Sequence, residues 1–144
     1  MARILIVDDH ADARAALREI LSWHAFQVCG DAENGKEAVE KVVEMKPEIV
    51  LMDINMPVMN GIAAAVEIQR VAPATKIVFL SVHDGPGFRT GTKPWADGFV
   101  RKTEAGKELI PTLERVAGFT ANEAHNDEHD DEPAARRAAR SSAL

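Results

Sequence analysis

The sequence predicts an α/β protein in which helices cover both faces of a parallel β-sheet, and three observations support this fold class. Short apolar runs alternate along the chain with longer segments of helical hydrophobic period. Two of the short runs, Ile4–Val7 and Ile49–Met52, are apolar throughout, as expected for central strands that are buried on both faces. The length of 144 residues suits one domain with one hydrophobic core.

Five short runs are the expected strands of this sheet. Four of them precede a stretch that can form a crossover helix, so the chain can be read as a series of strand–helix units. The expected strands are Arg3–Val7, Phe26–Cys29, Ile49–Met52, Lys76–Leu80 and Gly98–Arg101.

The first predicted helix follows the first strand. Its apolar residues recur at spacings of three and four, which places one stripe toward the core. Arg14, Arg18 and Glu19 are then expected to face water. The core stripe comprises Ala13, Ala16, Leu17, Ile20 and Leu21.

Two further helices have capping signals. Asn34 followed by Glu37 predicts a cap with its reciprocal acid, in a helix that ends before Pro47. Asn60 can cap a third helix over residues 61–71.

The second half of the chain has less regular signals. Residues 84–96 contain three glycines and two prolines where a fourth helix is due, so an irregular fourth helix is expected. An apolar stripe around Leu109 and Leu113 predicts a last helix, in which Pro111 requires a kink or a late start. After Gly118 the chain is acidic and alanine-rich, so we expect one domain over residues 1–118 and a disordered tail over residues 119–144.

Composition narrows the function classes. The formal charge of −6 does not favour a general electrostatic interaction with nucleic acid. Cys29 is the one cysteine, which excludes an intramolecular disulfide and a cysteine-based zinc cluster, and it is expected to pack as a small hydrophobic residue. The run Ile4–Val7 is too short for a signal peptide or a membrane span, so we expect a cytoplasmic protein without membrane contact.

Acidic residues and a lysine follow the predicted strands. Asp8 and Asp9 come after the first strand, Asp53 after the third, Ser81 after the fourth and Lys102 after the fifth. In an open parallel sheet, ligands bind at the carboxyl ends of the strands, so these side chains are expected to converge on one pocket.

Three carboxylates in one pocket repel each other. Two unit charges about 4 Å apart cost on the order of 4 kcal/mol at an effective dielectric constant near 20. A hard divalent cation removes this cost, and oxygen ligands favour Mg²⁺. One carboxylate can then attack phosphorus and form an aspartyl-phosphate, while Mg²⁺, the Lys102 ammonium and the Ser81 hydroxyl stabilise the transferred group.

Four segments in this order resemble the signature segments of response-regulator receiver domains of two-component systems. They are Val7–His10, Asp53–Gly61, Leu80–Asp84 and Ala96–Lys102. The resemblance covers the chain from Ala2 to about Gly118 and is greatest to receivers that precede a LuxR/NarL-type helix-turn-helix domain. It implies a flavodoxin-like (CheY-like) doubly wound sheet of five parallel strands in the order 2-1-3-4-5.

The resemblance also implies roles for the strand-end residues. Asp53 is implied to be the phosphoacceptor. Asp9 and Asp53 are implied to bind Mg²⁺ directly together with the Asn55 carbonyl, while Asp8 acts through water. Lys102 is implied to pair with the phosphoryl group.

Two pairs of residues are implied to control the response. Ser81, which also contacts the phosphoryl group, and Phe99 match the two switch positions, and Asn55 and His83 match the positions that tune dephosphorylation. His10 is expected to be a surface or loop histidine.

The function that the resemblance implies is a phosphorelay. A histidine kinase or phosphotransfer protein donates the phosphoryl group, and the receiver signals to an unknown downstream protein, with a weak homodimer left open. Such a protein is not an enzyme for other substrates, because it catalyses only its own phosphorylation and dephosphorylation. No helix-turn-helix pattern follows Gly118, so we expect a stand-alone receiver without direct DNA binding.

The sequence also departs from the family pattern. Thr103 replaces the proline found after the lysine in many receivers, the spacing from Ser81 to Lys102 is about one residue short, and the segment 84–96 places the usual output surface in doubt.

Three alternatives stay open. A Mg²⁺ phosphatase with an aspartyl nucleophile would carry a second aspartate where this chain has Asn55. A flavodoxin-like FMN protein would need a phosphate-binding loop where Asp8 and Asp9 repel phosphate. A receiver with degenerate switching would act as a constitutive interaction domain.

Overall fold

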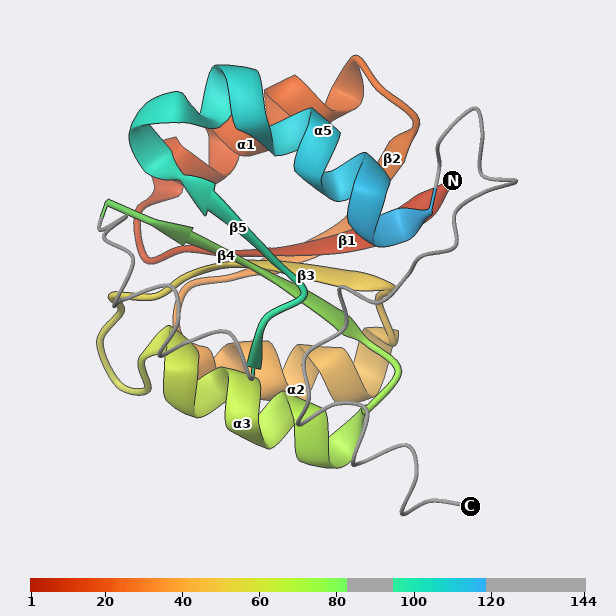
Figure 1. The fold of residues 1–144 in the computed structure, drawn as a ribbon. Coiled ribbons are helices and arrows are strands. Elements are labelled where there is room, and N and C mark those ends of the chain that lie inside the picture. Colours follow the sequence, from red (N-terminus) through yellow and green to blue (C-terminus); the bar gives the residue numbers. More distant parts are fainter. Residues whose placement is uncertain (83–94, 119–144) are drawn as a thin grey trace.

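The computed structural model describes residues 1–82 and 95–118, which form a five-stranded parallel sheet with helices on both faces (Figure 1). The strand order is β2-β1-β3-β4-β5, so the predicted doubly wound fold and its order 2-1-3-4-5 are confirmed. The elements are β1 (Ala2–Val7), α1 (Ala11–Ser22), β2 (Phe26–Ala32), α2 (Gly35–Met45), β3 (Ile49–Asp53), α3 (Gly61–Val71), β4 (Lys76–Ser81), β5 (Gly98–Arg101), the 3-10 turn η2 (Lys102–Glu104) and α5 (Ala105–Ala117).

The sheet separates two hydrophobic cores. In Figure 1, α1 and α5 cover one face, and α2 and α3 cover the other. Since successive strand residues point to opposite faces, β1 sends Ile4 and Ile6 into the core beneath α1 and α5, and Leu5 and Val7 into the core beneath α2 and α3. All four side chains are fully buried, which explains why this strand is apolar throughout.

The strand β2 extends three residues beyond its predicted end. Ile4 pairs with Val28 and Leu5 pairs with Gly30, so Cys29 is the extra residue of a β-bulge. The half-buried Cys29 thiol donates to the Ile4 carbonyl at 3.5 Å. This cysteine therefore packs within the sheet, as the sequence indicated.

Side chains cap α2 and α3 as predicted. The Asn34 carbonyl oxygen accepts from the Glu37 amide at 2.8 Å, and that of Asn60 accepts from the Ala63 amide at 2.9 Å. The reciprocal acid differs in detail, because the Glu37 carboxylate accepts from the Glu33 amide, one residue before the cap. Both helices therefore begin where the sequence placed them.

The helix α5 begins six residues before Pro111, so the late start considered for it is wrong. Pro111 lies on the exposed side of the helix, while Leu109 and Leu113 are buried against the sheet. Proline removes one hydrogen bond to the preceding turn, and the buried stripe holds the helix together across it. Gly118 ends the helix with a φ of 76°.

Some predictions lie outside the described residues. They concern most of the irregular fourth-helix segment (84–96), the tail over residues 119–144 and the position of His83. The domain boundary at residue 118 stays a prediction. Among the described helices, none combines the length and the apolar character that a membrane crossing requires.

Candidate functional site

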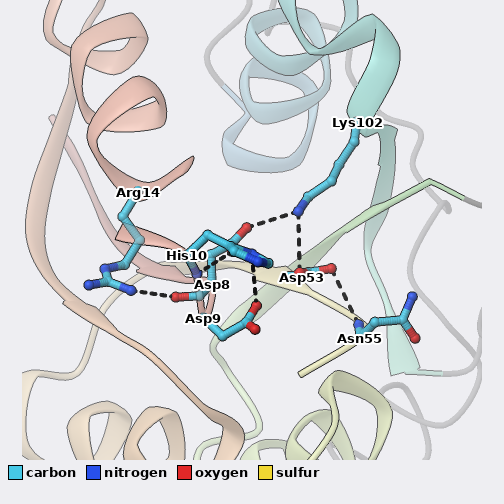
Figure 2. A network of polar contacts seen from close by, with 7 residues as sticks. All are labelled: Asp8, Asp9, His10, Arg14, Asp53, Asn55 and Lys102. Atoms are coloured by element: carbon cyan, nitrogen blue, oxygen red, sulfur yellow. Dashed lines mark hydrogen bonds and ion pairs between the residues drawn. The ribbon is translucent and has the colours of Figure 1, made fainter. Parts of the chain in front are cut away.

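Asp8, Asp53 and Lys102 lie together at the carboxyl end of the sheet (Figure 2). Asp8 follows β1, Asp53 is the last residue of β3, and Lys102 follows β5. The Lys102 ammonium lies 3.1 Å from Asp8 Oδ2 and 3.2 Å from Asp53 Oδ2, although β4 separates β5 from β3 in the sheet. The topology thus brings residues from distant parts of the chain into direct contact.

The two carboxylates that contact Lys102 are almost completely buried. Asp8 is 0% exposed and Asp53 is 4% exposed. A single ammonium between two carboxylates leaves one negative charge uncompensated in a place from which water is largely excluded. Buried charge of this kind requires a further partner or the uptake of a proton.

The protonation of the site reflects this imbalance. Burial raises the pKa of the Asp53 carboxyl, the Lys102 charge counteracts the rise, and the nearby Asp8 charge adds to it. Burial alone would lower the pKa of Lys102, but the hydrogen bond to Asp8 and the charges of Asp53 and Asp8 outweigh it, so the pKa of Lys102 is raised. The lysine therefore stays charged, and the carboxylates compete for it.

Asp9 and His10 extend the acidic cluster toward the surface. One ligand atom from each of Asp8, Asp9 and His10 lies within 4.8 Å of the other two. His10 Nδ1 is 3.2 Å from Asp9 Oδ1 and 3.4 Å from Asp8 Oδ1, and the His10 amide donates to Asp8 Oδ1 at 2.9 Å. The exposed His10 ring, expected to be a surface or loop histidine, thus borders the site directly.

The donor atoms of this cluster fit a hard divalent cation. Asp9 Oδ1 is buried and accepts no hydrogen bond from the part of the chain that the structure describes, since the His10 ring nitrogen lies near it without suitable geometry. An unsatisfied carboxylate oxygen in a cluster with the buried Asp8 carboxylate is an environment that a cation with oxygen ligands stabilises. The residues present therefore suit Mg²⁺.

Asn55 lies at the start of the loop after β3. Its backbone amide donates to Asp53 Oδ1 at 3.3 Å, whereas Lys102 contacts the other oxygen, Oδ2. Figure 2 shows the Asn55 side chain extending away from the acidic residues. Asn55 thus contacts Asp53 through its backbone in this structure.

The predicted switch residues lie on the neighbouring strands. Ser81 ends β4 and is completely buried. Phe99, in β5, is half-buried, and its ring meets the buried Phe79 ring edge to face with centroids 6.3 Å apart. Phe99 therefore packs at the border of the core beneath α2 and α3.

A strained turn holds the loop between β3 and α3. The Met59 amide donates to the Pro57 carbonyl at 2.7 Å across Val58, whose φ is 70°. A γ-turn with positive φ is rare and strained, particularly at a β-branched residue. The Gly35 amide, at the start of α2, donates to the Met59 carbonyl at 3.1 Å and so ties this loop to the neighbouring helix.

Arg14 is a site neighbour that the sequence pattern missed. It was expected to face water from α1, but one of its guanidinium nitrogens donates to the Asp8 carbonyl at 2.7 Å (Figure 2). A residue one turn into a helix can reach back over the preceding loop because its side chain is long. The periodicity of α1 reports the helix face and carries no signal of this reach.

Comparisons with known proteins agree with this fold. A family model described as the response regulator receiver domain matches residues 4–114. A chemotaxis protein CheY of Thermotoga maritima is 52% identical over 116 residues, which are 80% of this chain and 97% of the relative. The transcriptional regulatory protein DegU of Brevibacillus brevis is 37% identical over 117 residues, and the match covers 80% of this chain but only 50% of DegU.

Solved structures give the same result. The response regulator domain of Thermotoga maritima CheB superposes with a TM-score of 0.76 at 30% identity, covering 83% of this chain and 98% of that domain. The receiver domain of a NarL-type regulator from Mycobacterium tuberculosis gives 0.76 at 26% identity, with coverage of 83% and 98%.

Proposed function

This chain belongs to the response regulator receiver domain family, and from that premise we propose that it takes a phosphoryl group on Asp53 and passes a signal to a protein partner. One observation supports the proposal most directly: the Lys102 ammonium lies 3.2 Å from a buried Asp53 carboxylate at the end of a central strand. A nucleophilic carboxylate beside a fixed cation is what transfer of a phosphoryl group requires.

The transfer is a displacement at phosphorus. An Asp53 oxygen forms a bond to phosphorus while the phosphorus–nitrogen bond of a phosphohistidine donor breaks, and the leaving imidazole retains the electron pair and takes a proton from water. The donor class is a histidine kinase or a phosphotransfer protein. The Lys102 charge opposes the rise that burial causes in the pKa of Asp53, and the ammonium then neutralises an oxygen of the transferred group.

A bound Mg²⁺ supplies further positive charge to the phosphoryl oxygens. In this proposal Asp9 and Asp53 hold the ion with the Asn55 backbone carbonyl, and Asp8 holds it through water. The unsatisfied Asp9 oxygen and the burial of Asp8 and Asp53 support this assignment.

Phosphorylation adds a charge of about −1.5 to −2 at Asp53. We assign the response to Ser81, whose hydroxyl turns toward the new phosphoryl oxygens, and to Phe99, whose half-buried ring turns inward. Burial of Ser81 at the end of the strand beside β3 supports its part in this switch. Asn55 and His83 are assigned to tuning the loss of the phosphoryl group.

Acetyl phosphate with Mg²⁺ tests the proposal. The intact mass of the protein is expected to increase by one phosphoryl group in the wild type but not in Asp53→Asn. Asp12→Asn, at an exposed acid in the first turn of α1, is the matched control and should behave as the wild type. Labelling that survives in Asp53→Asn, or repeated release of phosphate from simple monoesters, would contradict the proposal and favour the phosphatase alternative.

A further inference from the structure

Asp8 is held at four of its polar atoms. Its amide donates to the Ala32 carbonyl at 3.1 Å, and its carboxylate oxygens contact the His10 amide and the Lys102 ammonium. The fourth contact is at the Asp8 carbonyl, which accepts the hydrogen bond from the Arg14 guanidinium at 2.7 Å. This carbonyl belongs to the peptide that joins Asp8 to Asp9.

The Arg14 side chain is itself fixed. It is largely buried, and its Nε lies 3.5 Å from the Asp31 carboxylate at the end of β2. Arg18 contacts the same Asp31 oxygen at 3.1 Å, and the Lys41 ammonium donates to the Asp31 carbonyl at 2.6 Å. The guanidinium is therefore held between α1 and β2, where it can restrain the peptide that it contacts.

Asp9 depends on this peptide more than Asp8 does. Asp9 Oδ1 accepts no hydrogen bond within the described ranges 1–82 and 95–118, and its ion-pair contact at 3.2 Å is with the His10 ring, which is itself 71% exposed. The orientation of the Asp8–Asp9 peptide sets the direction in which the Asp9 side chain leaves the backbone. Arg14 fixes that orientation without contacting the carboxylate.

We propose that Arg14 is a positioning residue for the cation site, which holds the Asp8–Asp9 peptide so that the Asp9 carboxylate is presented to Mg²⁺. This inference rests on the proposed function, since it requires that the acidic cluster binds the ion. Some residues hold the metal ligands in place without binding the metal themselves. Substitution of such a residue typically lowers the affinity for the metal by 10- to 100-fold.

The position of Arg14 allows a test that separates geometry from charge. Removal of a positive charge near a cation site should strengthen cation binding if only long-range electrostatics matters. Removal of the hydrogen bond to the Asp8 carbonyl should weaken binding if the peptide must be held. Arg14→Met, which retains much of the apolar stem, therefore gives opposite results for the two explanations.

Isothermal titration calorimetry with MgCl₂, at a temperature below the unfolding transition, measures the Kd of each variant for Mg²⁺. We expect the Kd for Mg²⁺ to increase about tenfold in Arg14→Met, while the rate of phosphorylation by acetyl phosphate at saturating Mg²⁺ stays within about twofold of the wild type. Arg18→Met is the matched control, because Arg18 shares the Asp31 partner but makes no contact with Asp8 among the described residues. Its Kd should equal that of the wild type or be slightly lower.

The outcomes separate the two levels of the proposal. If the wild type binds Mg²⁺ and is phosphorylated on Asp53, but Arg14→Met binds as tightly as Arg18→Met, the role of Arg14 is overturned and the proposed function stands. A loss of the maximal rate with an unchanged Kd would also overturn it. If the wild type binds no Mg²⁺, the cation site and the role of Arg14 are overturned together.

Discussion

At the scale of single residues, the site contains more negative charge than positive charge. Asp8 and Asp53 are buried and share one ammonium, so each carboxylate is only partly neutralised. This arrangement costs stability in the protein alone but prepares the site for a cation and a phosphoryl group. The cost and the benefit can be measured separately by changing one partner at a time.

Lys102→Met removes the shared cation. We expect it to destabilise the metal-free protein by about 1–3 kcal/mol, because two buried carboxylates lose their common partner, and to abolish labelling by acetyl phosphate. Urea unfolding measures the first effect and intact mass the second. Lys107→Met, at an exposed lysine of α5, should change neither; equal effects of the two substitutions would contradict the role of Lys102.

Asp53→Asn should act in the opposite direction. The raised pKa of Asp53 means that the folded state favours the protonated carboxyl, so ionisation of Asp53 destabilises the fold as the pH rises through its folded-state pKa. Replacement by the neutral amide should raise the Tm of the metal-free protein at pH 7. A gain of about 1 kcal/mol corresponds to roughly 2–8 °C.

The pH dependence provides the control. Below the pKa of an unfolded aspartate, position 53 is neutral in both the wild type and Asp53→Asn. The higher Tm of Asp53→Asn should therefore disappear in acid. Scanning calorimetry from pH 7 down to about pH 3, below the usual pKa of an aspartate, follows the difference in Tm between the two proteins. An advantage that is independent of pH would show that packing, and not the charge of Asp53, causes the change.

Some residues of the site could be identified from the sequence and others could not. Asp8, Asp53 and Lys102 each follow an apolar strand, and parallel strands bring their carboxyl ends to one edge. Arg14 and His10 were missed because their contacts depend on the path of the loop between β1 and α1, to which hydrophobic periodicity is insensitive.

At the scale of elements, the loop after β3 joins the site to α2. The Gly35 amide donates to the Met59 carbonyl, and a Cβ atom built on Gly35 would lie 2.3 Å from that oxygen. Such a distance requires backbone movement. The loop that begins at the proposed phosphoacceptor is therefore fitted to the first turn of the helix beside it.

Gly35→Ala tests this fit. We expect it to destabilise the protein by about 2 kcal/mol or more, since the close approach is to backbone and not to a flexible side chain. Gly106→Ala is the matched control, because a Cβ on Gly106 meets nothing within 4 Å in the first turn of α5. It should stabilise the protein by about 0.5–1 kcal/mol through helix propensity. Urea unfolding of both variants should therefore show effects of opposite sign, and equal signs would contradict the argument.

Strand β2 is longer than the sequence predicted. The predicted strand ended at Cys29, but Gly30 and Asp31, which are poor strand formers, also pair with β1. Pairing with a neighbouring strand overrides intrinsic preference, and a bulge at Cys29 restores the register. Local sequence preference predicts the first part of the strand, but the remaining residues are extended because they pair with β1.

At the scale of the whole molecule, the alternation of strands and helices predicted a parallel sheet covered by helices on both faces, and the resemblance to receiver domains implied its strand order. Apolar strands buried on both faces leave few arrangements other than a doubly wound sheet, and the observed order agrees with the expectation. The fold then determines the site, because the carboxyl ends of β1, β3 and β5 lie at one edge. Binding at this edge should therefore stabilise the entire domain.

Mg²⁺ is expected to raise the Tm of the wild type. A ligand that binds only the folded state stabilises it by RT ln(1 + [L]/Kd), about 2.7 kcal/mol at a concentration of 100 Kd, and each kcal/mol moves the Tm by roughly 2–8 °C. Asp53→Asn should lose most of this response because it removes one proposed ligand. Scanning calorimetry with MgCl₂, against NaCl at equal ionic strength, distinguishes binding from screening.

The same experiment joins the three scales. Arg14→Met should show a Tm response displaced to about tenfold higher Mg²⁺ concentration, whereas Asp53→Asn should show a response that is diminished at every concentration. A displaced curve indicates a site that is intact but poorly positioned, and a diminished curve indicates a missing ligand. If NaCl raised the Tm as much as MgCl₂ in all three proteins, the acidic cluster would be only a screened patch of charge, and the argument from the unsatisfied Asp9 oxygen would fail.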